Sequence, residues 1–122
     1  MRVTGATLEE LFRDALLGMV ALADPIAQAE RVPLRREIAV ESGDATALLV
    51  DFLNDALASM HTDREAYTNV TFHSLTERSL QAKLEGYRAE SFGEDIKAVT
   101  YHEADVRRAP SGQWETIIVF DI

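Results

Sequence analysis

The strongest constraint on the fold is a change in the spacing of apolar residues along the chain. Two segments in the first half carry apolar residues every three or four positions, as one face of an α-helix does. From residue 65 onward apolar and polar residues alternate, as they do in a strand with one buried face. Two helices followed by a run of strands predict an α+β fold.

The two helices have recognisable ends. The first is predicted over residues 6–24, where Thr7 and Glu10 form a capping box and Pro25 follows the last turn. The second is predicted over residues 44–61, with Asp44 as its N-cap. Both apolar faces are interpreted as core. Their residues are Leu8, Leu11, Phe12, Ala15, Leu16, Met19, Val20 and Ala23 in the first helix and Leu48, Leu49, Phe52, Leu53, Ala56, Leu57 and Met60 in the second.

Six strands are predicted around these helices, which gives the order β-α-β-α-β-β-β-β. A short strand covers residues 2–5, and a second alternates within residues 32–44. Two strands share residues 67–90, with a turn or bulge near Glu77–Ser79. The last two cover residues 96–109 and 113–122, on either side of the turn sequence APSG. We expect the helices to pack on one mostly antiparallel sheet, in a single domain of 122 residues.

Charge and composition limit the functions that are open to this chain. It has 21 acidic and 12 basic side chains and a net charge of −9. We expect no strong nucleic-acid binding by the chain alone, because that binding depends on Lys and Arg releasing counterions from phosphates. The charge suits docking on a basic protein surface, although it can also serve solubility alone. The absence of cysteine excludes disulfides and cysteine nucleophiles and suits a reducing cytoplasm. No signal peptide and no membrane-spanning run are predicted.

The last predicted strand ends in two oxygen donors. The apolar run ETIIVFDI holds Asp121 beside the α-carboxylate of Ile122. Two adjacent carboxylates predict half of a site for Ca²⁺, Mg²⁺ or Mn²⁺. The alternative is an ordinary solvated chain end, and on the chemistry alone that alternative is favoured.

Lys97 opens the preceding strand, and the register between the two strands decides which side of the sheet it shares. If the APSG turn closes with a Gly bulge, Asp121 faces Tyr101 and Lys97 points to the same side as Asp121. In that register Arg107 also faces Glu115, which mildly favours it. Without the bulge the register shifts by one residue and Lys97 points to the opposite side. In the bulged register Lys97 still lies about four residues along the strand from the position that faces Asp121.

The other acidic residues and the histidines are interpreted without a site. Asp51 and Asp55 lie four residues apart on the polar side of the second helix and are interpreted as solvated. We interpret His61 as a partner of the helix end, His73 as an exposed strand residue and His102 as a mid-strand residue. The three histidines do not have the spacing of zinc ligands.

The paired arginines and the tryptophan are interpreted as structural. Arg35, Arg36, Arg107 and Arg108 are predicted to lie on solvated faces, and Trp114 is predicted to pack across strands. No order of Ser, His and Asp predicts a nucleophile, and no glycine-rich loop predicts a phosphate-binding site.

Four stretches of the sequence together resemble the archease family. They are GATLEELFRDAL (5–16), LLVDFLNDAL (48–57), IKAVTYHEADV (96–106) and WETIIVFDI (114–122). The order and spacing also match, over essentially the whole chain. The most specific part is the KAVTYH stretch combined with a DI ending, since either helix alone is a weak signal.

The resemblance implies a protein cofactor rather than an enzyme. Archeases assist the RtcB-type RNA ligase, which joins RNA ends in tRNA splicing; they promote guanylylation of its active-site histidine and allow multiple turnover. GTP is then used by the ligase and is not bound here. The resemblance further implies that Lys97 is needed for activation, and that Asp121 and Ile122 hold a divalent cation, namely Ca²⁺ or else Mg²⁺ or Mn²⁺.

One part of the family pattern is missing. Archeases usually begin with a strand resembling HTADVGIRAWG, whose aspartate is a metal ligand, whereas this sequence starts at Met1 inside that strand. Losing that carboxylate is expected to weaken metal binding. A chaperone-like or adaptor protein without an RNA-processing role is the alternative function, and it requires an exposed apolar patch. A metal-dependent hydrolase is a third hypothesis, against which the lack of a third ligand and of a general base argues.

Overall fold

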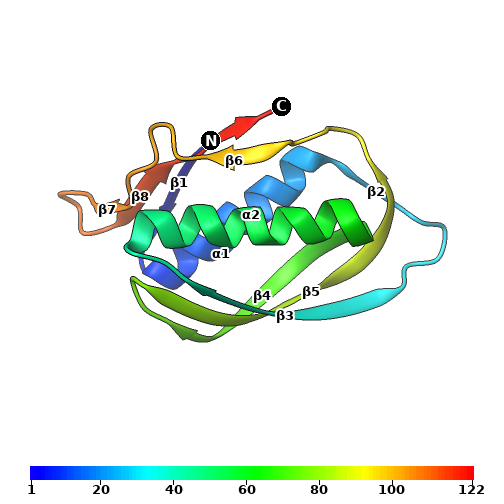
Figure 1. Cartoon of the computed structure of the whole chain (residues 1–122), viewed down its shortest axis with the longest axis horizontal. Coiled ribbons are helices and arrows are strands. Elements are labelled where there is room, and N and C mark those ends of the chain that lie inside the picture. The colour runs from blue at the N-terminus through cyan, green and yellow to red at the C-terminus, as the bar shows by residue number, and fades with distance from the viewer.

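The α+β class is confirmed, with three more strand segments than the sequence predicts. The computed structural model describes residues 1–122, and Figure 1 shows the arrangement of the elements. The order is β1 (Arg2–Gly5), α1 (Leu8–Ala23), β2 (Pro25–Ala27), β3 (Pro33–Glu41), α2 (Ala45–Asp63), β4 (Glu65–Leu75), β5 (Ser79–Phe92), β6 (Ala98–Thr100), β7 (Arg107–Arg108), β8 (Trp114–Ile117) and β9 (Val119–Asp121). Neither helix combines the length and apolar composition that a membrane-spanning helix needs.

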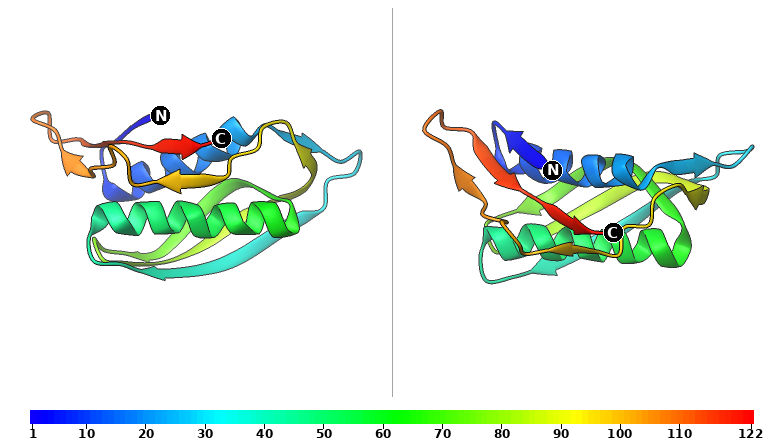
Figure 2. Two further views of the ribbon diagram at one scale, coloured as in Figure 1. Left: turned by 45° about the horizontal axis from the view of Figure 1, so that its top comes forward. Right: turned by 90° about the horizontal axis from the view of Figure 1, so that it is seen from above.

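All strand pairs are antiparallel, but they form three sheets instead of the single sheet predicted. The long strand β5 pairs with β2, β3 and β4; β8 lies between β1 and β7; and β6 pairs with β9. Figure 2 shows the helices between the β3–β4–β5 sheet and the strands near the two termini. Helix α1 contacts β1, β4 and β8, and α2 contacts β3, β4 and β6. The helices therefore pack between the β3–β4–β5 sheet and the strands near the termini.

Both predicted helix caps are present. The N–H of Glu10 donates to Thr7 Oγ1 at 3.1 Å, and the carboxylate of Glu10 accepts from the N–H of Ala6 at 2.7 Å, so the return bond of the capping box lies one residue earlier than expected. At the second helix the N–H of Ala47 donates to Asp44 Oδ1 at 2.8 Å. These caps fix where each helix begins.

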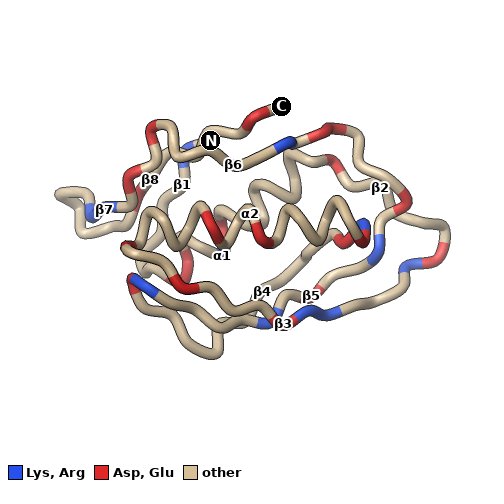
Figure 3. The backbone as a smooth tube through the Cα atoms, viewed as in Figure 1, with Lys and Arg blue, Asp and Glu red and all other residues tan.

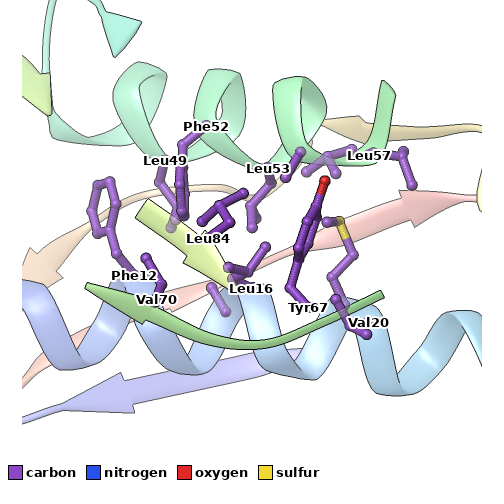
Figure 4. Close-up of a cluster of buried hydrophobic side chains, with 14 of the residues drawn as sticks. Phe12, Leu16, Val20, Leu49, Phe52, Leu53, Leu57, Tyr67, Val70 and Leu84 are labelled. Atoms are coloured by element: carbon purple, nitrogen blue, oxygen red, sulfur yellow. The ribbon is translucent and has the colours of Figure 1, made fainter. Parts of the chain in front are cut away.

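The core joins the two predicted apolar faces. Every residue of those faces is buried except Leu8, which is half-buried. Figure 4 shows Phe12, Leu16 and Val20 of α1 opposite Phe52 and other residues of α2. The rings of Phe12 and Phe52 have centroids 5.9 Å apart. The periodicity therefore identified the core correctly.

The prediction that Arg36 lies on a solvated face is wrong. It donates to both carboxylate oxygens of Glu65, at 2.6 and 3.1 Å, and to Asp63 at 2.8 Å. Glu65 is only 5% exposed and also accepts from the Tyr67 hydroxyl at 2.8 Å. Burial acts to raise the pKa of Glu65, but the hydrogen bonds from Arg36 and Tyr67 outweigh it and hold that pKa below its usual value. This network ties β3 to the junction between α2 and β4.

Candidate functional site

The two C-terminal strands predicted from the sequence are both interrupted. Near the turn, Arg107 faces Glu115, as the bulged register predicts, and Gly112 has the positive φ of 88° that such a turn needs. At the other end Asp121 faces Ala98 and not Tyr101. The predicted register is therefore right at the turn and wrong by three residues at the chain end.

The shift arises because residues 101–106 leave the ladder. The N–H of Ala104 donates to the Tyr101 carbonyl at 3.0 Å, and Glu103 adopts a left-handed conformation with φ 61°. The next two N–H groups, of Asp105 and Val106, donate to threonine side chains at 3.0 Å each. These side-chain bonds replace the missing strand partners. The prediction of a mid-strand position for residue 102 is wrong for the same reason.

The shift brings Lys97 next to Asp121. The N–H of Lys97, which directly precedes β6, donates to the Asp121 carbonyl at 2.7 Å, so the two main chains are in direct contact. The side chains of Lys97, Asp121 and Ile122 are all exposed. The ammonium of Lys97 forms no salt bridge, whereas that of the second lysine, Lys83, lies 3.6 Å from Glu85. Figure 3 shows acidic residues along the chain before and after β6.

Asn54 of α2 takes the place of a neighbouring strand on the other side of β6. Its Nδ2 donates to the Val99 carbonyl, and its Oδ1 accepts from the Val99 N–H, both at 2.9 Å. One amide side chain thus satisfies both main-chain groups of a residue that is 4% exposed. Helix α2 therefore holds the segment that contains Lys97.

Asp51 provides a second link between α2 and this segment. Its carboxylate accepts from the Ser42 hydroxyl at 2.6 Å and from the Tyr101 hydroxyl at 2.9 Å. The prediction that Asp51 is merely solvated is therefore wrong, while Asp55 is exposed as predicted. The hydrogen bond to Asp51 raises the pKa of the Tyr101 hydroxyl, and burial adds to the effect.

The residues at the chain end do not by themselves fit a divalent cation. The structure contains no group of three His, Cys, Asp or Glu side chains that could hold a metal ion. Asp121 and the carboxylate of Ile122 leave most of the six to eight oxygen positions that Ca²⁺ takes unfilled. The prediction that His73 is an exposed strand residue is confirmed, since it lies in β4 with its Nε2 3.2 Å from Glu37. His61 lies in the last turn of α2.

The predicted solvated positions of Arg107 and Arg108 and the predicted cross-strand packing of Trp114 are confirmed, and both arginines are exposed. Glu115 lies 3.5 Å from Arg107, and it also accepts from Arg2 at 3.2 Å. The guanidinium of Arg108 lies 5.1 Å from the centroid of the Trp114 ring, so the tryptophan packs across the strand pair. Glu115 of β8 thus contacts side chains from both neighbouring strands, β1 and β7.

Comparison with known proteins gives one consistent family. Residues 1–122 match the sequence profile of the Archease protein family (MTH1598/TM1083). Proteins named archease from Thermococcus gammatolerans and Methanosarcina mazei are 33% and 32% identical to this chain, covering 100% and 97% of it and 90% and 85% of themselves. A solved structure of an archease from Thermotoga maritima, described as a possible chaperone, has a TM-score of 0.71 at 20% identity and covers 100% of this chain and 88% of its own. That likeness supports the fold.

Proposed function

Because this chain belongs to the archease family, we propose that it activates an RtcB-type RNA ligase in cytoplasmic tRNA splicing. In this proposal it acts as a protein cofactor and not as an enzyme. It promotes guanylylation of the ligase's active-site histidine and allows multiple turnover, while GTP binds only to the ligase. The net charge of −9 favours docking on a basic face of that partner.

The observation that carries the proposal is the exposed Lys97, whose ammonium forms no salt bridge and whose main-chain N–H donates to the Asp121 carbonyl. Asn54 holds the main chain of Val99, and Asp51 accepts from the Tyr101 hydroxyl, so α2 holds the segment that carries Lys97. Lysine serves as a point charge for phosphate groups. Transfer of a guanylyl group develops negative charge on phosphate oxygens, and a cation placed in advance near them lowers the barrier. We assign this role to Lys97, with Asp121 at the contact between the two proteins.

A divalent cation, Ca²⁺ or else Mg²⁺ or Mn²⁺, enters the proposal only as an occupant of Asp121 and Ile122. These two carboxylates supply too few ligands for a closed site, so further oxygen ligands would come from outside them. The roles of Lys97 and Asp121 do not depend on that cation.

The proposal is tested by following incorporation of radiolabelled GTP into the cognate ligase. Substoichiometric amounts of this protein should raise both the rate and the final number of guanylylated ligase molecules. A folded protein that leaves labelling unchanged with its cognate ligase would contradict the proposal.

A chaperone-like or adaptor function is the second candidate. Leu22, Ile26 and Val32 are each about half exposed, and one related protein is described as a possible chaperone. Such a function predicts that the protein suppresses aggregation of unrelated clients and that Lys97→Ala leaves this suppression intact. Light scattering of a heated client protein measures it.

A further inference from the structure

A second concave site lies beside the candidate functional site without sharing a residue with it. A pocket of about 400 Å³ opens between the C-terminal half of α2 and residues 90–96. Its apolar wall includes Leu57 and Met60 of α2, Phe92 of β5 and Ile96. The volume lies in the range of pockets that bind ligands. Ile96 directly precedes Lys97, so the pocket and the lysine belong to one continuous segment.

The rim of this pocket is mainly acidic. Glu90, Glu94 and Asp95 are exposed, line the pocket and form no salt bridge. His61 and Arg64 lie on the α2 side, and the guanidinium of Arg64 donates to the main-chain carbonyl of Glu90 at 3.2 Å. Three carboxylates thus face the solvent at the mouth of an apolar pocket without a partner of opposite charge.

The ends of both helices strengthen the negative potential there. Helix α1 ends at Ala23, which lines the pocket, and Met60 and His61 lie in the last turn of α2. The C-terminal end of a helix carries a partial negative charge. Arg64 supplies one positive charge against three carboxylates and two helix ends, so the balance favours a cation at the mouth, while the wall favours an apolar group inside.

We propose that this pocket receives a large apolar side chain of the partner protein whose neighbour is an arginine or lysine. The proposal rests on the proposed function, because the partner is taken to be the ligase. The apolar side chain is the anchor, and the basic neighbour pairs with Glu94 and Asp95 at the rim. An anchor in this pocket would place the partner directly beside Lys97.

The first test is binding of the ligase to a double charge reversal at the rim, Glu94→Lys with Asp95→Lys. The matched control is Glu41→Lys with Glu77→Lys, which makes the same change in net charge at the opposite end of α2, on exposed residues without salt bridges. Biolayer interferometry should show the rim variant binding at least about tenfold more weakly than the control variant, mostly through slower association. Equal weakening in both variants would overturn the pocket proposal and leave the activator proposal standing.

The second test examines the chemistry of the pocket without the ligase. Phenethylamine and 3-phenylpropionate have the same phenyl ring but opposite charges, positive on the amine and negative on the carboxylate. In methyl NMR spectra the amine should shift the signals of Met60 and Ile96, and the carboxylate should not. Equal shifts, or none with either compound, would overturn the proposal. A wild-type protein that shows the amine-specific shifts but does not bind the ligase would contradict the identity of the partner and retain the pocket's preference.

Discussion

Replacing Asn54 with alanine should release β6 from α2 and lower the stability of the whole protein. The substitution removes two hydrogen bonds of 2.9 Å and leaves the N–H and the carbonyl of Val99 without partners. An unsatisfied buried polar group costs about 1–3 kcal/mol. Because Asn54 itself is half-buried, some water reaches the site, and we expect a total loss of about 2–4 kcal/mol in the free energy of unfolding.

Urea unfolding followed by far-UV circular dichroism measures this loss. The matched control is Asp55→Ala, the exposed neighbour on the same helix, which should change the free energy of unfolding by less than about 0.5 kcal/mol. If the two variants have the same unfolding midpoint, Asn54 does not hold β6 and the account of how Lys97 is positioned is wrong.

Three further predictions concern acid stability, backbone strain and metal binding. Hydrogen bonds from Arg36 and Tyr67 hold the pKa of Glu65 below its ordinary value of 4.5. The stability that they provide is therefore complete above pH 4.5 and is lost as the pH falls through the lower folded-state pKa. Glu65→Gln should flatten the fall in unfolding free energy below pH 4.5, and an unchanged acid slope would contradict this. Glu103 has φ 61°, so Glu103→Gly should raise the unfolding free energy by up to about 1 kcal/mol in urea titrations, and a loss would show that the left-handed residue is not strained. Calorimetric titration with Ca²⁺ should show only weak binding that Asp121→Asn abolishes, whereas tight binding would require ligands beyond the two carboxylates.

The helices and the core were predictable because their signals are local. Thr7 with Glu10 and Asp44 mark the two helix starts, and the three-and-four spacing of apolar residues defines both buried faces. The turn between β4 and β5 near Glu77–Ser79 was also predicted, since polar residues interrupt the alternation there.

The break at residues 101–106 was not predictable in the same way. The sequence HEAD contains no Gly or Pro, and the left-handed residue is Glu103. The N–H groups that follow are satisfied by Thr116 and Thr46, which are distant in sequence. No local pattern reports a bond of this kind, and the error displaced the predicted partner of Asp121 by three residues.

The supporting residues of the candidate site were missed for a related reason. Asn54 and Asp51 lie on the polar side of α2, where a residue that binds another element has the same periodicity as a solvated one. Arg36 and Glu65 are 29 residues apart, so their ion pair has no sequence signature either. Family resemblance and position in the chain predict the roles of Lys97 and Asp121, and the fold brings their main chains into contact.

The most direct test of the central claim is ligase guanylylation with Lys97→Ala beside Lys83→Ala. The chain has only these two lysines, and Lys83 is already paired with Glu85. The account predicts that both variants stay folded by circular dichroism, that Lys83→Ala activates as the wild type does, and that Lys97→Ala does not activate. Full activation by a folded Lys97→Ala variant would contradict the claim that the exposed ammonium of Lys97 acts on the ligase.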